Sequence, residues 1–319
     1  MKVKTSNSNL IKILGILLFV VILSRIDLRE VGRQFRNTNI KLLLLSITAI
    51  FVLIVIKSAR WKYIARIQGT EIPLGKSILA YTASLYLGIV TPGRIGDFAK
   101  SYYLYKSGMS AGKALFSSLI DRLFDIIILL IIGYLSLFFF PDIIKNQILS
   151  TSLLFLLIIA LILIVISKRK IIVKLIRRFV SGVKFLKKGE RVSELIEDML
   201  NEFSLLNLTS TVKITLLTLT ATIFHYSYFV ISAKALGINI PLGTLILCIS
   251  AAIFVGLIPV SIAGVGTRDA ALIVLFSHIG HTREEAISFS FVFILSYLII
   301  GIVGFICWNL APFRMEKEE

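Results

Sequence analysis

The chain has 319 residues, 57% of them hydrophobic, and its mean hydropathy is +0.91. Soluble domains are about 45–50% apolar, so this composition excludes an ordinary soluble fold and predicts an integral membrane protein. The net charge of +17 fits nucleic-acid binding, but in a membrane protein it more commonly reflects basic cytoplasmic loops that face anionic headgroups. We therefore expect the membrane as a partner and no nucleic acid.

Long apolar runs without the alternation of a barrel predict an all-α integral membrane protein. The first run follows a basic start and has no small-residue cleavage site, so we expect an uncleaved helix rather than a signal peptide. Hydropathy predicts about six full spans, near 10–26, 40–66, 113–140, 149–167, 212–236 and 284–310.

Two further apolar segments, 77–90 and 243–258, are short and end in breaks rich in proline and glycine. Each is followed by a short helix, at 96–106 and 266–278, so we predict two re-entrant helical hairpins. The break residues are Pro92, Gly93, Gly96, Pro259, Gly264 and Gly266. A broken helix at membrane depth persists only where protein or a wet cavity encloses it, so both breaks are candidate functional sites.

The distribution of basic residues predicts the orientation. Segment 168–191 contains ten Lys and Arg residues, which places it in the cytoplasm. Counting spans outward from this segment puts both termini in the cytoplasm of a multi-pass protein of the cell membrane. Loop 27–40, with three arginines, then faces outward, although basic loops usually face the cytoplasm. The opposite orientation would put the ten basic residues of 168–191 outside, which departs further from this tendency. Loop 168–211 is also amphipathic and is either a surface segment on the inner leaflet or a solvated linker.

The order of elements repeats along the chain, because each half reads as two spans, a broken hairpin and a further span. Residues 1–145 are the first predicted membrane repeat, and residues 146–319, with the basic cytoplasmic loop 168–211, are the second. Together they form one membrane domain whose hairpins enter from opposite sides. Such inverted-topology repeats are frequent in transporters, where the substrate binds near the midplane between broken helices.

Ionisable residues at the breaks are the first candidate substrate-binding groups. Arg94 and Asp97 lie in the first break, and Arg268 and Asp269 follow the glycines of the second. A helix that begins at Gly96 would point free N–H groups into the break, and an arginine fork beside it suits phosphate. These groups therefore fit an anionic lipid headgroup. The alternative is a structural Arg–Asp pair that pins each hairpin shut.

Three charges near the start of the 113–140 span complete the predicted site: Asp121, Arg122 and Asp125. Asp125 has apolar neighbours, so we expect it to face the bundle interior and to pair with Arg122 or Arg94. Asp121 and Arg122 are alternatively a snorkelling pair at the interface. The predicted substrate-binding set is Arg94, Asp97, Arg122, Asp125, Arg268 and Asp269.

Other polar residues receive structural interpretations. The Arg-Trp-Lys-Tyr sequence at 60–63 is typical of an interfacial anchor, and His225 is expected to be hydrogen-bonded packing. His278 and His281, with nearby glutamates, match no zinc motif. The sequence also lacks HExxH, P-loop, GxSxG and clustered-aspartate motifs. We therefore expect no metal, no cofactor and no catalytic residue.

Four segments carry a resemblance to a known family: Arg60–Trp61, TPGRIGDFAKSYYL at 91–104, DRLFD at 121–125 and PVSIAGVGTRDAAL at 259–272. In combination they resemble the lysylphosphatidylglycerol synthase transmembrane-region family, which includes the flippase domain of the multiple peptide resistance factor. Where that family often has glutamate, this chain has Asp97 and Asp269. The resemblance implies a stand-alone, flippase-like module, and we expect the soluble domain that transfers lysine to phosphatidylglycerol to be absent.

Three functions are compatible with these features. The leading hypothesis is a flippase-like transporter that moves an anionic or modified lipid, such as an aminoacylated, glyco- or polyprenyl-linked lipid, between leaflets. The alternative is a membrane-embedded subunit or enzyme of lipid modification, similar to lysylphosphatidylglycerol synthase or associated with a glycosyltransferase. A third is a scaffold whose basic loop recruits a soluble synthase or glycosyltransferase. The expected ligand is thus a phospholipid or a polyprenyl-linked lipid.

Overall fold

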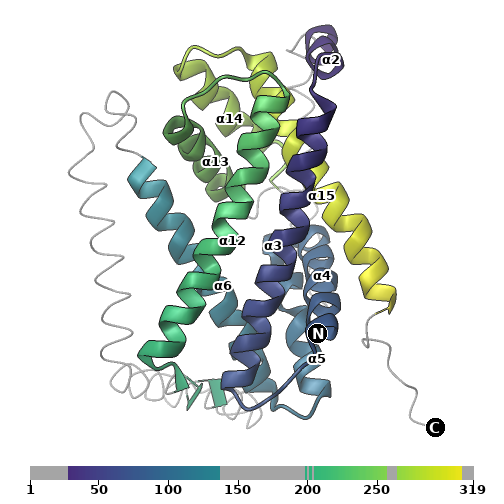
Figure 1. Cartoon of the computed structure of the whole chain (residues 1–319), viewed down its shortest axis with the longest axis vertical. Helices are drawn as coiled ribbons and strands as arrows, with labels where there is room; N and C mark the ends of the chain where they lie inside the picture. Colours follow the sequence, from purple (N-terminus) through teal and green to yellow (C-terminus); the bar gives the residue numbers. More distant parts are fainter. Residues whose placement is uncertain (1–27, 137–197, 200, 203–204, 257–263, 311–319) are drawn as a thin grey trace, which may run out of the picture.

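The computed structural model describes residues 28–136, 198–199, 201–202, 205–256 and 264–310. These residues form a bundle of helices (Figure 1), which confirms the predicted all-helical class for the described part of the chain. The predicted spans near 10–26 and 149–167, residues 168–197 of the basic loop and the break residue Pro259 lie outside the described residues.

Three helices of 28 residues are long and apolar enough to cross a membrane: α3 (Ile40–Ile67), α12 (Leu208–Ala235) and α15 (Arg283–Leu310). At 1.5 Å per residue each measures about 42 Å, more than the ~30 Å hydrocarbon core. Asparagine caps start two of them: Asn39 accepts hydrogen bonds from the first turn of α3, and Asn207 accepts one from α12. Helix α6 (Ala111–Ser136) is nearly as long but carries charges.

Helices α3 and α12 lie side by side and run in opposite directions (Figure 1). The hydroxyl of Ser232 donates to Ser46 at 2.9 Å, and Arg60 donates to Thr218 at 2.8 Å nearer the other end. Small hydroxyl residues let membrane helices approach closely and hydrogen-bond across their interface. The shorter apolar helices pack against this pair.

Two shorter apolar helices, α4 (Leu74–Val90) and α13 (Leu242–Gly256), have 17 and 15 residues. Short connections join α3 to α4 and α12 to α13. Because α3 and α12 run in opposite directions, α4 and α13 start at opposite ends of the bundle, and both stop inside it (Figure 1).

After α4 the chain turns back through a 3₁₀ helix, η1 (Pro92–Ala99), and helix α5 (Lys100–Lys106). The second helix of this hairpin was predicted to begin at Gly96, but the 3₁₀ turn begins at Pro92, whose fixed φ suits a first helical position. The Thr91 hydroxyl donates to the Leu87 carbonyl at 2.7 Å and accepts from the Gly96 N–H at 2.8 Å. A single threonine thus closes the break.

Glycine is required where η1 returns along α4. A Cβ at Gly96 would lie 2.2 Å from the Leu87 carbonyl, so the two backbones touch directly. Gly88 faces η1 in the same way, because its Cβ would lie 2.2 Å from an Asp97 carboxylate oxygen. The glycines therefore place Asp97 against the last turn of α4.

The second break precedes α14 (Thr267–His278) and uses left-handed glycines. Gly264 and Gly266 have φ of 78° and 90°, which a residue with a Cβ rarely adopts. The N–H of Gly266 donates to the Asp269 carboxylate at 2.8 Å, which caps the start of α14. Around this break an aromatic core that includes Phe229, Phe276 and Phe289 joins α12, α14 and α15.

Candidate functional site

A cluster of buried and half-buried charges joins α3, η1, α5 and α6 at the first break. The participants are Lys57, Arg60, Arg94, Asp97, Lys100, Asp121, Arg122 and Asp125. Five are basic and three are acidic, so this cluster carries a surplus of two positive charges. Charges at this density within an apolar bundle are costly and are typical of a functional site.

Asp121 is the centre of the cluster. Its side chain is fully buried and accepts from Arg60 Nε at 2.8 Å, from the Tyr81 hydroxyl at 3.0 Å and from Lys100 Nζ. The Lys100 ammonium also lies over the Tyr81 ring, 4.1 Å from its centroid. Asp121 therefore connects helices α3, α4, α5 and α6.

Asp125 lies one turn further along α6 and is held from α3. Lys57 Nζ and Arg60 Nη1 each lie 2.7 Å from its carboxylate. The prediction that Asp125 pairs with Arg122 or Arg94 was therefore wrong, because α3 packs against this face of α6 and supplies both cations. The side chains of Lys57 and Asp125 are 18% and 16% exposed, so this end of the cluster is less enclosed than Asp121.

Asp97 lies within the first break, and two arginines share its carboxylate. Arg94 Nε is 3.3 Å from its carboxylate, and the Arg122 guanidinium is also in contact with it. Asp97 is 1% exposed, yet neither carboxylate oxygen accepts a hydrogen bond of normal geometry from a described residue. The Arg94 and Arg122 side chains are 32% and 20% exposed. One carboxylate thus serves two accessible guanidinium groups, which leaves capacity for a second anion.

The backbone at Arg94 is strained. Its φ is 57°, which makes it the one non-glycine residue with positive φ among the described residues. Such conformations cost about 1–3 kcal/mol and cluster at ligand-binding and switch regions. The surrounding structure therefore holds Arg94 in a backbone conformation that it would not favour by itself.

The second break also brings its predicted pair together, but in an enclosed form. Arg268 Nη2 lies 2.7 Å from Asp269, whose carboxylate also accepts from Ser290 and from the Gly266 N–H. The Arg268 guanidinium lies 4.7 Å from the centroid of the Phe293 ring. Arg268 and Asp269 are 1% and 0% exposed. The geometry at this break fits the structural alternative better than direct ligand contact.

Three members of the cluster, Lys57, Arg60 and Lys100, were not assigned to the site from the sequence, and neither was Tyr81, which donates to Asp121. The interfacial-anchor interpretation of residues 60–63 was wrong for Arg60 and Trp61, both 0% exposed. The signal available was the three-residue spacing of Lys57 and Arg60 in an apolar run, which puts both on one helix face.

Among the residues that the structure describes, no three His, Cys, Asp or Glu side chains lie close enough together to hold a metal ion. His281 Nδ1 lies 3.0 Å from Glu285, whose carboxylate also accepts from the Thr282 N–H at the start of α15. These two residues therefore take part in capping a helix.

Comparison with known proteins places the chain among membrane proteins. A family model described as "Lysylphosphatidylglycerol synthase TM region" matches residues 9–304. A UPF0104 membrane protein of Methanocaldococcus jannaschii, MJ1595, is 23% identical over 335 aligned residues, covering 100% of this chain and 99% of the relative. No solved structure matches. Since the family model covers most of the sequence, the chain belongs to the lysylphosphatidylglycerol synthase transmembrane-region family.

Proposed function

We propose that this protein is a flippase-like transporter that moves an anionic or modified lipid between leaflets. The observation that carries the proposal is the charge cluster at the first break, where two accessible arginines share the buried Asp97. A phosphate accepts bidentate hydrogen bonds from arginine and would supply the missing negative charge. Arg94 and Arg122 would contact the headgroup, while Asp97 would hold them when the site is empty.

The arrangement of α4 and α13 supports a transport cycle. They enter from opposite ends of the bundle and stop within it, as expected for re-entrant hairpins of two inverted repeats. Rocking of one half against the other would expose the break alternately to each leaflet. In this cycle Arg268 and Asp269 would hold the second hairpin in shape, and both termini would face the cytoplasm.

Reconstitution of the purified protein into liposomes tests this function. Fluorescent phosphatidylglycerol, phosphatidylcholine and a polyprenyl phosphate would be offered, and transbilayer movement would be followed by quenching of the outer-leaflet dye. We expect faster movement of an anionic lipid, and a loss of about 10- to 100-fold with Arg94→Ala, the range for one charge-assisted hydrogen bond.

Arg66→Ala is the matched control, because Arg66 is 68% exposed and pairs only with the exposed Glu71 among the contacts observed. Its rate should equal that of the wild type. The proposal would be refuted if neither the wild type nor Arg94→Ala accelerated the movement of any lipid in the panel relative to protein-free liposomes.

A role in lipid modification is the second candidate, since the family description names the membrane region of a synthase. The chain would then be a membrane-embedded subunit that presents a lipid to a soluble synthase or glycosyltransferase, or would act on the lipid itself. Its distinguishing sign is product formation in detergent, where movement between leaflets has no meaning.

A further inference from the structure

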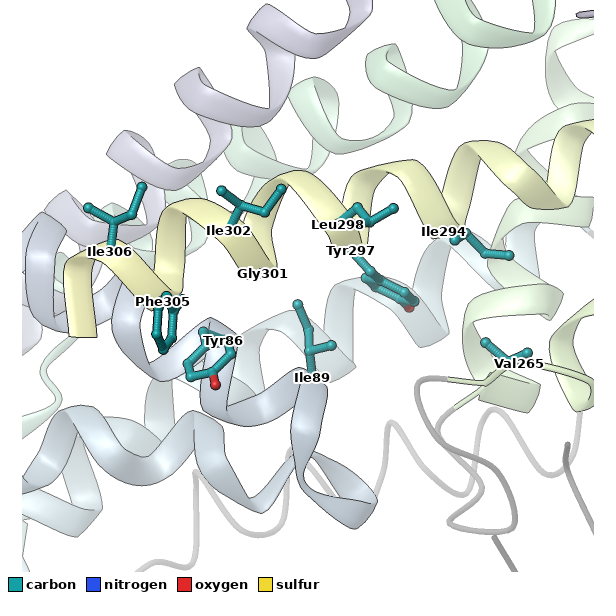
Figure 2. Close-up of a pocket in the computed structure, with 10 residues that line it drawn as sticks. All are labelled: Tyr86, Ile89, Val265, Ile294, Tyr297, Leu298, Gly301, Ile302, Phe305 and Ile306. Atoms are coloured by element: carbon teal, nitrogen blue, oxygen red, sulfur yellow. The ribbon is translucent and has the colours of Figure 1, made fainter. Parts of the chain in front are cut away.

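A groove between α15 and the end of α4 (Figure 2) has no residue of the charge cluster in its lining. It has a volume of about 600 Å³. The lining comes from α15, from the last turns of α4 and from Val265 of the second break: Tyr86, Ile89, Val265, Ile294, Tyr297, Leu298, Gly301, Ile302, Phe305 and Ile306. None of these side chains is charged. In Figure 2 Tyr297 and Phe305 of α15 point toward Tyr86 and Ile89 of α4, with Val265 at one end.

The groove belongs to the lipid-facing surface. Leu298, Ile302, Phe305 and Ile306 are each more than half exposed and lie on a helix long and apolar enough to span a membrane. At such positions the medium is hydrocarbon rather than water. The polar side-chain groups of the lining are the hydroxyls of Tyr86 and Tyr297, so it suits a chain of methylenes better than a charged headgroup.

The length of the groove fits one leaflet. Its α15 lining runs from Ile294 to Ile306, and twelve steps of 1.5 Å give about 18 Å. Half of a ~30 Å hydrocarbon core is about 15 Å. The groove can therefore hold most of one acyl chain extended within a single leaflet.

The groove also meets the first break. Ile89 is in the last turn of α4, and the η1 turn with Arg94 starts two residues after that helix ends. A lipid whose chain follows the groove would thus have its headgroup near the accessible Arg94 and Arg122, which share one carboxylate. Charge complementarity favours an anionic headgroup.

We infer that this groove holds one acyl chain of an anionic phospholipid while its headgroup lies at the first break. The inference rests on the proposed function and adds the class of substrate and the place of its tail. The headgroup would cross through protein, and the tail would remain in a lipid-like environment throughout.

Gly301 offers a clean test, because a Cβ there would meet nothing within 4 Å. Gly301→Phe should fill the groove without disturbing the packing of α15. Gly75→Phe is the matched control, since Gly75 also has open space but lies at the start of α4. Ile302→Trp, at a position 58% exposed, fills the groove from a second residue.

The full chain would be placed in nanodiscs with phosphatidylglycerol that carries a diazirine in its acyl chain, and labelled peptides of α4 and α15 would be quantified. Groove-filling variants should lower labelling about tenfold, because a displaced chain loses on the order of ten close carbon–carbon contacts, worth about 0.1–0.2 kcal/mol each. Gly75→Phe should label like wild type, and the same probe with a phosphatidylcholine headgroup should label wild type less.

Equal labelling in Gly301→Phe, Ile302→Trp and wild type would overturn the inference, as would loss of a dimer in Gly301→Phe, which would assign the groove to a second copy. Equal labelling by both headgroups would overturn the anionic assignment. The transport assay separates the two proposals. If the wild-type groove is labelled but the wild-type protein moves no lipid, only the transporter proposal is contradicted. If Gly301→Phe moves lipid as fast as the wild type, only the groove proposal is contradicted.

Discussion

Replacing Asp121 with asparagine removes one charge from the centre of the cluster and keeps its shape. In the structure this carboxylate accepts from Arg60, Lys100 and Tyr81, and all four residues are buried. An amide has one acceptor oxygen, and its NH₂ would face these donors. Lys100 then loses the carboxylate that it contacts, and Arg60 keeps only the Asp125 carboxylate among the described residues. Breaking a buried ion pair by removing one partner costs about 3–5 kcal/mol.

Thermal unfolding of the purified protein in detergent measures this cost. A loss of that size lowers the melting temperature by roughly 10 °C in a domain of a few hundred residues. Fluorescence of Trp61 is a suitable reporter, since its indole is buried and donates to Ser117 at 3.2 Å.

Asp97→Asn is the comparison, because Arg94 and Arg122 are partly exposed and regain hydration when their carboxylate is neutralised. We expect a much smaller thermal shift for Asp97→Asn together with a loss of transport. Equal shifts for both variants, or an unchanged melting temperature for Asp121→Asn, would refute the division between a structural Asp121 and a functional Asp97.

Two further substitutions test the breaks. Gly96→Ala places a Cβ 2.2 Å from the Leu87 carbonyl and should lower the melting temperature and the transport rate together, whereas Gly75→Ala, which meets nothing within 4 Å, should do neither. Arg268→Lys keeps the charge but removes the guanidinium that lies 4.7 Å from the centroid of the Phe293 ring. It should cost up to about 2 kcal/mol, the value for a desolvated cation–π contact. A wild-type melting temperature in this variant would show that charge alone is sufficient there.

Helix bounds and breaks could be predicted from the sequence because both depend on local chemistry. Hydropathy located α3, α12 and α15 to within a few residues, and the Pro/Gly signal found the end of α4. The membership of the charge cluster could not be predicted in the same way. Arg60 contacts Asp121 and Thr218, residues 61 and 158 positions away. Such partners are chosen by how helices pack, and Arg60 beside Trp61 has the local pattern of an interfacial anchor.

The two breaks contain similar residues, but the charges of their arginines are balanced in different ways. At the second break Arg268 is balanced by an adjacent Asp269 that Ser290 and the Gly266 N–H also bind, so its charge is satisfied within the protein. At the first break Arg94 and Arg122 share the single carboxylate of Asp97. A pair of satisfied charges resists a ligand, whereas an undercompensated pair attracts an anion. The balance of charge therefore distinguishes the first break, where the proposed headgroup would bind, from the second.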